Sequence, residues 1–134
     1  MTHPSKRKGD AAELEVQALL QDHLGVPARR MLGAGRKDDV GDIAGVPDTT
    51  VQVANHKDVA AAVRHKPVEC EQQRERAGTT HAATFIRLRG GDWRVVLTVE
   101  QWCALWREAD PALTAYPAFT TSPTRQTITR EEAA

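Results

Sequence analysis

Residues 41–57, Gly-Asp-Ile-Ala-Gly-Val-Pro-Asp-Thr-Thr-Val-Gln-Val-Ala-Asn-His-Lys, contain the pattern that decides the fold. Two short runs with β-branched residues, 40–44 and 50–55, lie on either side of the turn-forming segment 45–48. Gly, Pro and Asp between such runs are typical of a tight connection between two strands. The segment therefore predicts a pair of neighbouring strands.

The faces of these strands follow from their sequence. Successive side chains of a strand point to opposite faces, so Val51 and Val53 should enter the core. By the same rule, Gln52 and Ala54 should point the other way. Asp42 begins the neighbouring strand, from which it can reach the same side as Gln52. We therefore expect a carboxylate and an amide together on one face of the sheet.

A helix should precede this pair of strands. Asp10 can cap it, with Glu13 at the third helical position as in a capping box, and 25–27 should end it. The apolar face of this helix consists of Val16, Leu20 and Leu24. At about 100° per residue, Glu13 projects towards that face. An inward carboxylate either completes the cap or serves a functional site. Residues 1–9 should form a polar, frayed basic arm.

The remaining segments predict further strands and helices on both sides of the pair. They are a strand at 28–32, a helix from Asp58 to Ala77, strands at 82–88 and 93–97, and a helix that Thr98 caps. Gly78 should end the middle helix, and Pro67 inside it should kink or split it. Residues 89–92, Arg-Gly-Gly-Asp, signal a hairpin.

The last helix carries an apolar stripe of Val99, Trp102, Cys103 and Trp106. We expect this stripe to join the core, and the alternative is a surface for a partner. After the helix, residues 110–134 are rich in Thr, Pro and Ala, which predicts a loosely attached tail. The chain of 134 residues suits one domain, here 10–109, since domains usually have about 100–150 residues. The element order predicts an α/β or α+β sandwich on one mixed sheet.

Charge narrows the function classes. The chain has 18 basic and 18 acidic side chains, which argues against coating nucleic acid by bulk charge but allows a local basic site. Residues 38–63 carry one basic and five acidic groups, whereas 1–37 and 64–94 each carry seven basic and four acidic groups. An acidic segment between basic flanks is typical of a site that holds a metal and grips a polyanion. Chance variation on a solvated surface is the alternative.

Composition also bears on the compartment. No apolar run approaches the ~20 residues of a membrane span, and the basic N-terminus leads into no apolar stretch. Cys70 and Cys103 form neither a metal-ligand spacing nor a disulfide framework, so we expect them to be small buried or half-buried groups. We therefore expect a reduced, cytoplasmic setting and no membrane partner.

The chain resembles a nuclease family. Asp42, Gln52 ten residues later, position 54 and the upstream Glu13 together resemble the PD-(D/E)XK nuclease superfamily. The wider run from Arg29-Arg30 through 41–47 to Asn55-His56-Lys57 is similar to the small Holliday-junction-resolvase-like nucleases of bacteriophages. The resemblance extends over about residues 6–98. It implies a restriction-endonuclease-like αβββαβ core, an α/β fold with a mixed central sheet flanked by helices.

The same resemblance implies an activity and its residues. It implies a Mg²⁺-dependent, structure-selective DNA endonuclease of DNA recombination, with Mn²⁺ as a possible substitute for Mg²⁺. A homodimer would act on branched DNA in the cytoplasm of a bacterial host. Asp42 and Gln52 would be the metal ligands, and Glu13 would lie near the metal. In such sites the metal activates water, and a lysine orients that water and offsets negative charge.

The chain departs from the family pattern at two positions. Gln52 stands where the family has an acidic residue, and Ala54 stands where it has a lysine. An amide oxygen can still bind a metal, but without charge. Lys57, just past the strand, could reach back as the catalytic lysine over its long stem. The alternatives are Lys37 and Arg36 on the preceding loop.

DNA contacts are expected from basic side chains, because such side chains make most phosphate contacts. The candidates are Arg29, Arg30, Arg36, Lys37 and His56, with the basic arm at 6–8 as a further contact. The alternative for these residues is an ordinary solvated surface.

Two other functions remain open. A catalytically impaired DNA-binding or scaffold protein could keep the nuclease fold, since Gln52 and Ala54 weaken the site. A small protein-interaction domain could instead use the face of Trp102 and Trp106.

Overall fold

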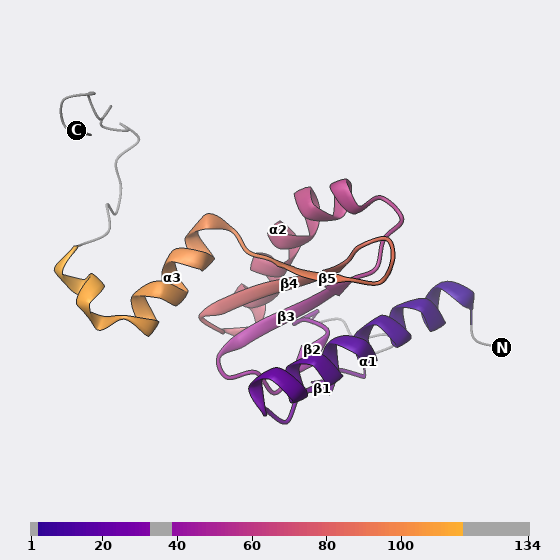
Figure 1. Ribbon diagram of the computed structural model, residues 1–134, viewed down its shortest axis with the longest axis horizontal. Coiled ribbons are helices and arrows are strands. Elements are labelled where there is room, and N and C mark those ends of the chain that lie inside the picture. The colour runs from indigo at the N-terminus through magenta and orange to yellow at the C-terminus, as the bar shows by residue number, and fades with distance from the viewer. Residues whose placement is uncertain (1–2, 33–38, 117–134) are drawn as a thin grey trace.

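The computed structural model describes residues 3–32 and 39–116. Its elements are α1 (Pro4–Leu24), β1 (Arg29–Arg30), β2 (Ile43–Ala44), β3 (Thr49–Ala54), α2 (Val59–Ala77), β4 (His81–Arg87), β5 (Trp93–Val96), α3 (Val99–Ala109) and the short 3₁₀ helix η1 (Pro111–Ala115). The strands form one sheet in the order β1-β2-β3-β4-β5. Strands β3 and β4 are parallel, and the other neighbours are antiparallel. The protein is therefore α/β, with a mixed central sheet flanked by helices, as the sequence predicted (Figure 1).

The strand pair within residues 41–57 is confirmed, although β2 is shorter than expected. Ile43 of β2 lies opposite Val51 of β3. Gly45, which follows β2, has φ 103°, and a Cβ added there would lie 2.4 Å from the carbonyl oxygen of Pro27. Only glycine tolerates both that φ and that close approach, so Gly45 allows the chain to leave β2 beside the segment that leads into β1.

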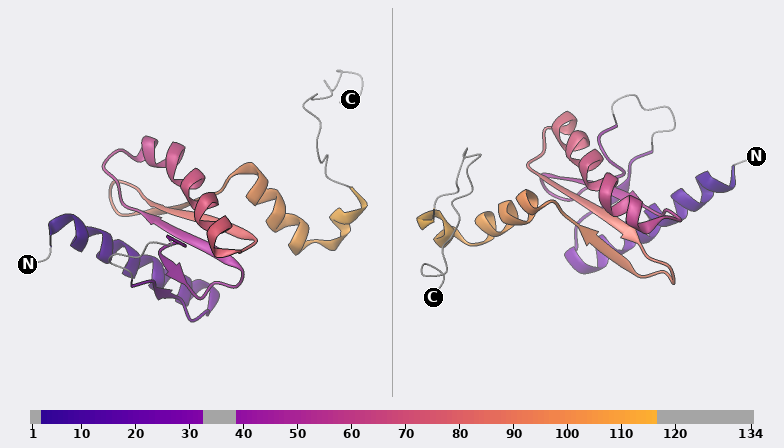
Figure 2. Two further views of the ribbon diagram at one scale, coloured as in Figure 1. Left: turned by 180° about the vertical axis from the view of Figure 1, so that it is seen from behind. Right: turned by 90° about the horizontal axis from the view of Figure 1, so that it is seen from above.

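Helices α1 and α2 cover opposite faces of the sheet (Figure 2). On the α1 face, Val16 and Leu20 pack with Ile43 and Val51 in an apolar core. On the α2 face, a second apolar cluster is formed by Ala54, Ala62 and Ile86. The predicted alternation along β3 is therefore confirmed, since Val51 serves one face and Ala54 the other.

The predicted start of the first helix is wrong. Helix α1 begins at Pro4, because Pro suits the first helical position and the backbone N–H groups of Lys6 and Arg7 donate to the His3 carbonyl oxygen. Asp10 and Glu13 therefore lie inside the helix and form no capping box. The predicted apolar face is also too long, because Leu24 is 59% exposed.

Helix α2 has the predicted ends. The Asp58 carboxylate accepts from the backbone N–H of Ala61, and Gly78 ends the helix in the left-handed conformation with φ 74°. Pro67 is buried within the helix and does not split it. The predicted hairpin between β4 and β5 is confirmed, since these strands are antiparallel and Gly90 and Gly91 have positive φ.

The apolar stripe of α3 does not belong to the core, contrary to the prediction. Thr98 caps the helix as expected, but Val99 is 74% exposed and Cys103 is also exposed. The two tryptophans, Trp102 and Trp106, are 55% and 50% exposed. The contacts that attach α3 to β4 include polar ones, since Gln101 accepts from the Ala82 N–H and the Glu108 carboxylate contacts the His81 ring. The rest of α3 projects from the sheet at the end opposite the N-terminus (Figure 1).

Three further predictions concern a membrane span, the cysteines and the C-terminal segment. Among the described residues, no helix is both long and apolar enough to cross a membrane. Cys70 is buried, as expected, and burial raises the pKa of its thiol to about 11. Within the predicted tail, residues 111–115 form η1, and 117–134 lie outside the described residues.

Candidate functional site

Strands β2 and β3 bring Asp42 and Gln52 side by side. The backbone N–H of Asp42 donates to the Val51 carbonyl oxygen at 2.8 Å. The Asp42 carboxylate accepts from the backbone N–H of Val53, also at 2.8 Å. These two bonds join Asp42 to Val51 and Val53, the residues before and after Gln52. Asp42, directly before β2, therefore lies beside Gln52 of β3, as predicted.

Gln52 lies on the expected face, and one oxygen of Asp42 is fixed beside β3. The Gln52 side chain points to α2, where its amide nitrogen lies 3.3 Å from a Glu69 carboxylate oxygen. Strand N–H groups point sideways within the sheet, so the oxygen of Asp42 that accepts from Val53 lies at the level of the sheet. The predicted shared face of Asp42 and Gln52 stays a prediction.

The surroundings of Asp42 disfavour its charged form. Burial raises the pKa of Asp42 above its ordinary value of 3.8, and the hydrogen bond from Val53 opposes that effect. The charge of Asp39 raises the pKa further, and the charge of Lys66 lowers it. A carboxylate held like this becomes more stable when a cation binds beside it.

Gln52 has an amide oxygen that is buried without a hydrogen-bond partner. The residue is 5% exposed, and its Oε1 finds no partner among the described residues. The amide nitrogen of Gln52 donates to Glu69, so Oε1 points away from Glu69. A buried polar atom without a partner is destabilising unless a ligand or water completes it.

Two residues of α2, Lys66 and Glu69, complete the polar cluster. The Lys66 ammonium lies 2.8 Å from the same Glu69 oxygen that faces Gln52. The hydrogen bond from Lys66 lowers the pKa of Glu69, against a smaller opposing effect of burial. We call Asp42, Gln52, Lys66 and Glu69 the α2-face cluster. It combines two carboxylates, one amide and one ammonium.

The cluster continues towards the end of α2. Gln73 is 4% exposed and donates from its amide nitrogen to the Asp39 carboxylate at 2.8 Å. Arg76 lies 3.7 Å from the other Asp39 oxygen. Asp39 is the first described residue after the segment 33–38, so these contacts fix where the chain enters the strand pair.

Glu13 faces inward as predicted, but it is engaged by an arginine. The Nε of Arg30 lies 3.0 Å from Glu13, and its Nη2 lies 2.5 Å from Asp10. Burial raises the pKa of Glu13, the Arg30 bond lowers it, and the charge of Asp42 raises it. The Asp42 charge therefore acts on Glu13. The ion pair of Glu13 with Arg30 holds α1 against β1.

The predicted DNA contacts fall in different places. The Arg30 guanidinium is bound within the protein, and exposed Arg29 donates to the Ala28 carbonyl oxygen. His56 is exposed beyond the end of β3 and lines an open pocket there. Arg36 and Lys37 lie outside the described residues. The roles of all of these residues in DNA binding stay predictions.

Two lysines, Lys57 and Lys66, are candidates for the catalytic cation. Lys57 is exposed past the end of β3, whereas Lys66 contacts Glu69 directly. Ala54, which stands where the resemblance expects lysine, is 1% exposed and packs with Ala62 and Ile86. A lysine at position 54 would place its stem in this apolar cluster, so α2 is the better source of a cation.

The donor set of the α2-face cluster fits a hard divalent cation. Carboxylate and amide oxygens are the ligands that Mg²⁺ prefers, and the Oε1 atom of Gln52 is such an oxygen without a partner. Within the described part of the chain, no group of three or more His, Cys, Asp or Glu residues is placed to hold a metal. A cation here would therefore depend on the amide of Gln52 as well as on carboxylates.

The sequence analysis missed Lys66 and Glu69. The helical pattern contains a signal for them, because they recur at intervals of three and four residues from buried Ala62. Polar residues on the buried stripe of a helix indicate a polar interface with the sheet. The strand motif of residues 41–57 contains no information about this stripe of the second helix.

Comparisons with protein-family models, curated proteins and solved structures find no match to this chain.

Proposed function

We propose that the protein is a Mg²⁺-dependent, structure-selective DNA endonuclease that acts on branched DNA in the manner of a Holliday junction resolvase. The α2-face cluster is its active site. The observation that carries the proposal is the buried Gln52 Oε1 without a partner, beside the raised pKa of Asp42. Both features are destabilising in the protein alone, and a bound cation would relieve both.

Each residue of the cluster has a distinct role in this proposal. Asp42 and Gln52 would hold Mg²⁺ or Mn²⁺, and Glu69 would support the amide of Gln52. A bound metal ion supplies polarisation of the phosphate and a water of lowered pKa. Lys66 supplies the positive charge that offsets developing negative charge on the phosphate. Glu13 keeps a positioning role through Arg30.

The second candidate is a catalytically impaired DNA-binding protein with the same fold. The observation that favours it is the pairing of Lys66 with Glu69, which holds both residues without any metal. An uncharged Gln52 would also weaken metal affinity. In this case DNA binding would persist in chelator and no cleavage would occur.

Association of two copies belongs to the proposal, because two symmetric cuts need two active sites. The surface that we propose for this association is the exposed apolar face of α3. Val95, Val99 and Trp102 line a hollow of about 300 Å³, and exposed Trp106 projects from the same helix. A two-fold interface can place the Trp106 of each copy in the hollow of the other. Because the net charge of the chain is zero, two copies do not repel each other through their net charge.

Cleavage assays on labelled DNA test the proposed function. Purified protein is incubated with four-way, flapped and linear DNA in Mg²⁺, Mn²⁺ or chelator. We expect metal-dependent cleavage of branched DNA that Asp42→Asn abolishes. Binding without cleavage in any metal would favour the impaired protein, and cleavage that survives Asp42→Asn would place the active site elsewhere.

A further inference from the structure

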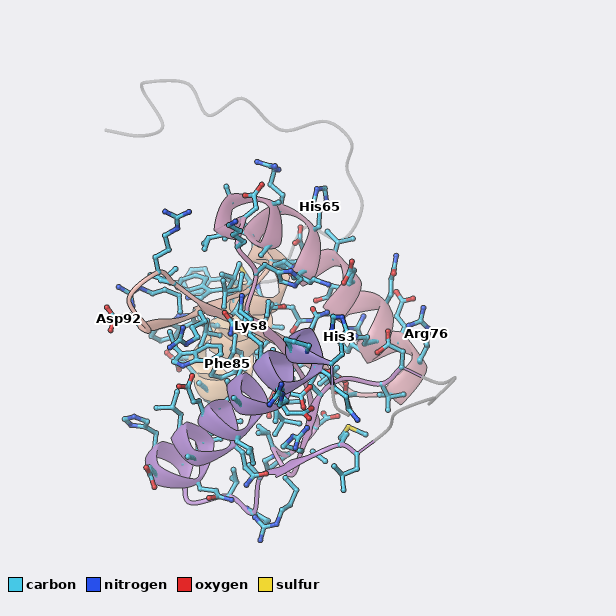
Figure 3. All side chains as sticks on the ribbon, turned by 90° about the vertical axis from the view of Figure 1, so that its right-hand side faces the viewer. His3, Lys8, His65, Arg76, Phe85 and Asp92 are labelled. Atoms are coloured by element: carbon cyan, nitrogen blue, oxygen red, sulfur yellow. The ribbon has the colours of Figure 1, made fainter. Side chains whose placement is uncertain are left out.

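A row of basic side chains lies at the carboxyl ends of the parallel strands β3 and β4. His56 and Lys57 follow β3, Arg87 ends β4, and Arg89 follows it. Because the two strands are parallel, these residues meet at the same end of the sheet. Figure 3 looks onto this end of the molecule, with Lys8 of α1 near the centre of the view and His65 of α2 above it.

Three adjoining hollows follow this row. One of about 470 Å³ contains His56, Lys57 and Lys66 in its wall. The next, of about 350 Å³, is lined by Lys8, His56, Lys57, Arg87 and Arg89 among others. The third, of about 640 Å³, again includes Lys57 and Arg89. Lys57 lines all three hollows, so they adjoin one another. We call them together the basic groove and define it by its cations, which are Lys8, His56, Lys57, Lys66, Arg87 and Arg89.

Several cations of the groove form no ion pair with another described residue. Among the described residues, Lys8, Lys57 and Arg89 form no ion pair. Lys66 is paired with Glu69, and Arg87 lies 3.2 Å from Glu15. The walls also contain two carboxylates, that of Glu69 and that of Asp58, which caps α2. Clustered cations without partners raise one another's electrostatic energy, and an anion in the groove removes that cost.

We propose that the basic groove binds the phosphate backbone of a nucleic acid strand and leads it to Lys66 and Glu69. A groove that runs over three hollows fits an extended polyanion better than a compact phosphate ligand. Its end at Glu69 joins the α2-face cluster, so a strand in the groove would pass the candidate active site. Only this destination rests on the proposed function, since binding itself needs no metal and no cleavage.

Fluorescence anisotropy with labelled duplex and four-way DNA in chelator tests the groove. The test variant is Lys57→Ala with Arg89→Ala. The control is Arg94→Ala with Arg107→Ala, which removes the same charge from β5 and from the end of α3. We expect the slope of log affinity against log salt to become shallower by about 1.8 in the test variant, since each phosphate contact contributes about 0.9. The control should keep the slope of the natural protein.

Further arms make each result decisive. Lys57→Arg with Arg89→Lys should restore the natural slope, which separates charge from misfolding. Equal slopes in the test and control variants would overturn the proposal. Binding of anionic lipid vesicles that is stronger than DNA binding and lost in the test variant would also overturn it, in favour of a membrane surface. Absence of cleavage in Mg²⁺ would overturn the proposed function and leave this result standing.

Discussion

The two faces of the sheet are built differently. The α1 face is apolar, with Val16 at 0% and Val51 at 1% exposure in its core. On the α2 face, Ala54, Ala62 and Ile86 form a small apolar cluster, and the polar residues Gln52, Gln73 and Thr84 are also buried. Each of these three side chains has an atom without a partner among the described residues. The α1 face therefore stabilises the fold, and the α2 face holds polar groups that the fold alone does not satisfy.

The carboxylates repeat this contrast. On the α1 side, Asp10 and Glu13 both contact the Arg30 guanidinium, so each carboxylate has a cationic partner within the protein. At the α2-face cluster, burial raises the pKa of Asp42. The nearby Lys66 ammonium is paired with Glu69. Groups that remain unsatisfied in a folded protein are often the groups that a ligand uses.

Removal of the Asp42 charge should have the largest effect on activity. Asp42→Asn keeps an acceptor for the Val53 N–H but lacks the charge that holds a metal. We expect a loss of cleavage of at least about a hundredfold, comparable to the loss of a key electrostatic group in other enzymes. Single-turnover cleavage of a labelled four-way junction measures it. Asp22→Asn on exposed α1 is the matched control and should cleave normally.

Core truncation should separate the two faces by stability. Val16→Ala on the α1 face removes two methyl groups from a fully buried site and should cost about 2 kcal/mol. Thr84→Val on the α2 face replaces a buried hydroxyl without a partner and should stabilise the protein by about 1 kcal/mol. Urea unfolding gives both values. A similar loss for both variants would contradict the contrast between the faces.

The two lysines should affect different steps. Lys66 contacts Glu69 where the groove meets the α2-face cluster, so Lys66→Met should lower kcat by about 10²-fold or more, with a smaller effect on KM. Lys57 lies only in the basic groove, so Lys57→Ala should raise KM and leave kcat nearly unchanged. Steady-state kinetics at constant salt makes the comparison. The reverse pattern would restore Lys57 as the catalytic lysine.

The raised pKa of Asp42 predicts a smaller, pH-dependent effect on stability. A carboxyl group whose pKa is raised on folding binds its proton more tightly in the folded state, so its contribution falls as the pH rises from 3.8 through the raised pKa. Asp42→Asn should therefore match the natural protein in acid and exceed it in stability at neutral pH. Urea unfolding in chelator across this range measures the difference. A constant difference at all pH values would contradict the assignment.

Much of the fold could be predicted because local signals agree with the final packing. Alternation in 50–55, the Asp58 cap and the left-handed Gly78 each act within a few residues. The start of α1 was wrong because a capping pattern at Asp10 was read without the competing start at Pro4. The α3 stripe was wrong because amphipathicity shows that a face is apolar but not what covers it.

The candidate site was only partly predictable for a similar reason. Asp42 and Gln52 are joined by strand pairing, which their spacing along the chain already implies. Lys66 and Glu69 reach the cluster through the packing of α2 on the sheet. That packing depends on contacts between distant segments, so sequence spacing alone could not distinguish Lys66 from Lys57.

Calorimetric titration of Mn²⁺ tests the central claim that the α2-face cluster is a metal site. The natural protein and Asp22→Asn should bind Mn²⁺, and Asp42→Asn should show no heat of binding. Gln52→Glu should bind more tightly than the natural protein, because a carboxylate replaces the amide oxygen that lacks a partner. Binding of Mn²⁺ by Asp42→Asn with unchanged affinity, or no binding by the natural protein, would contradict the account.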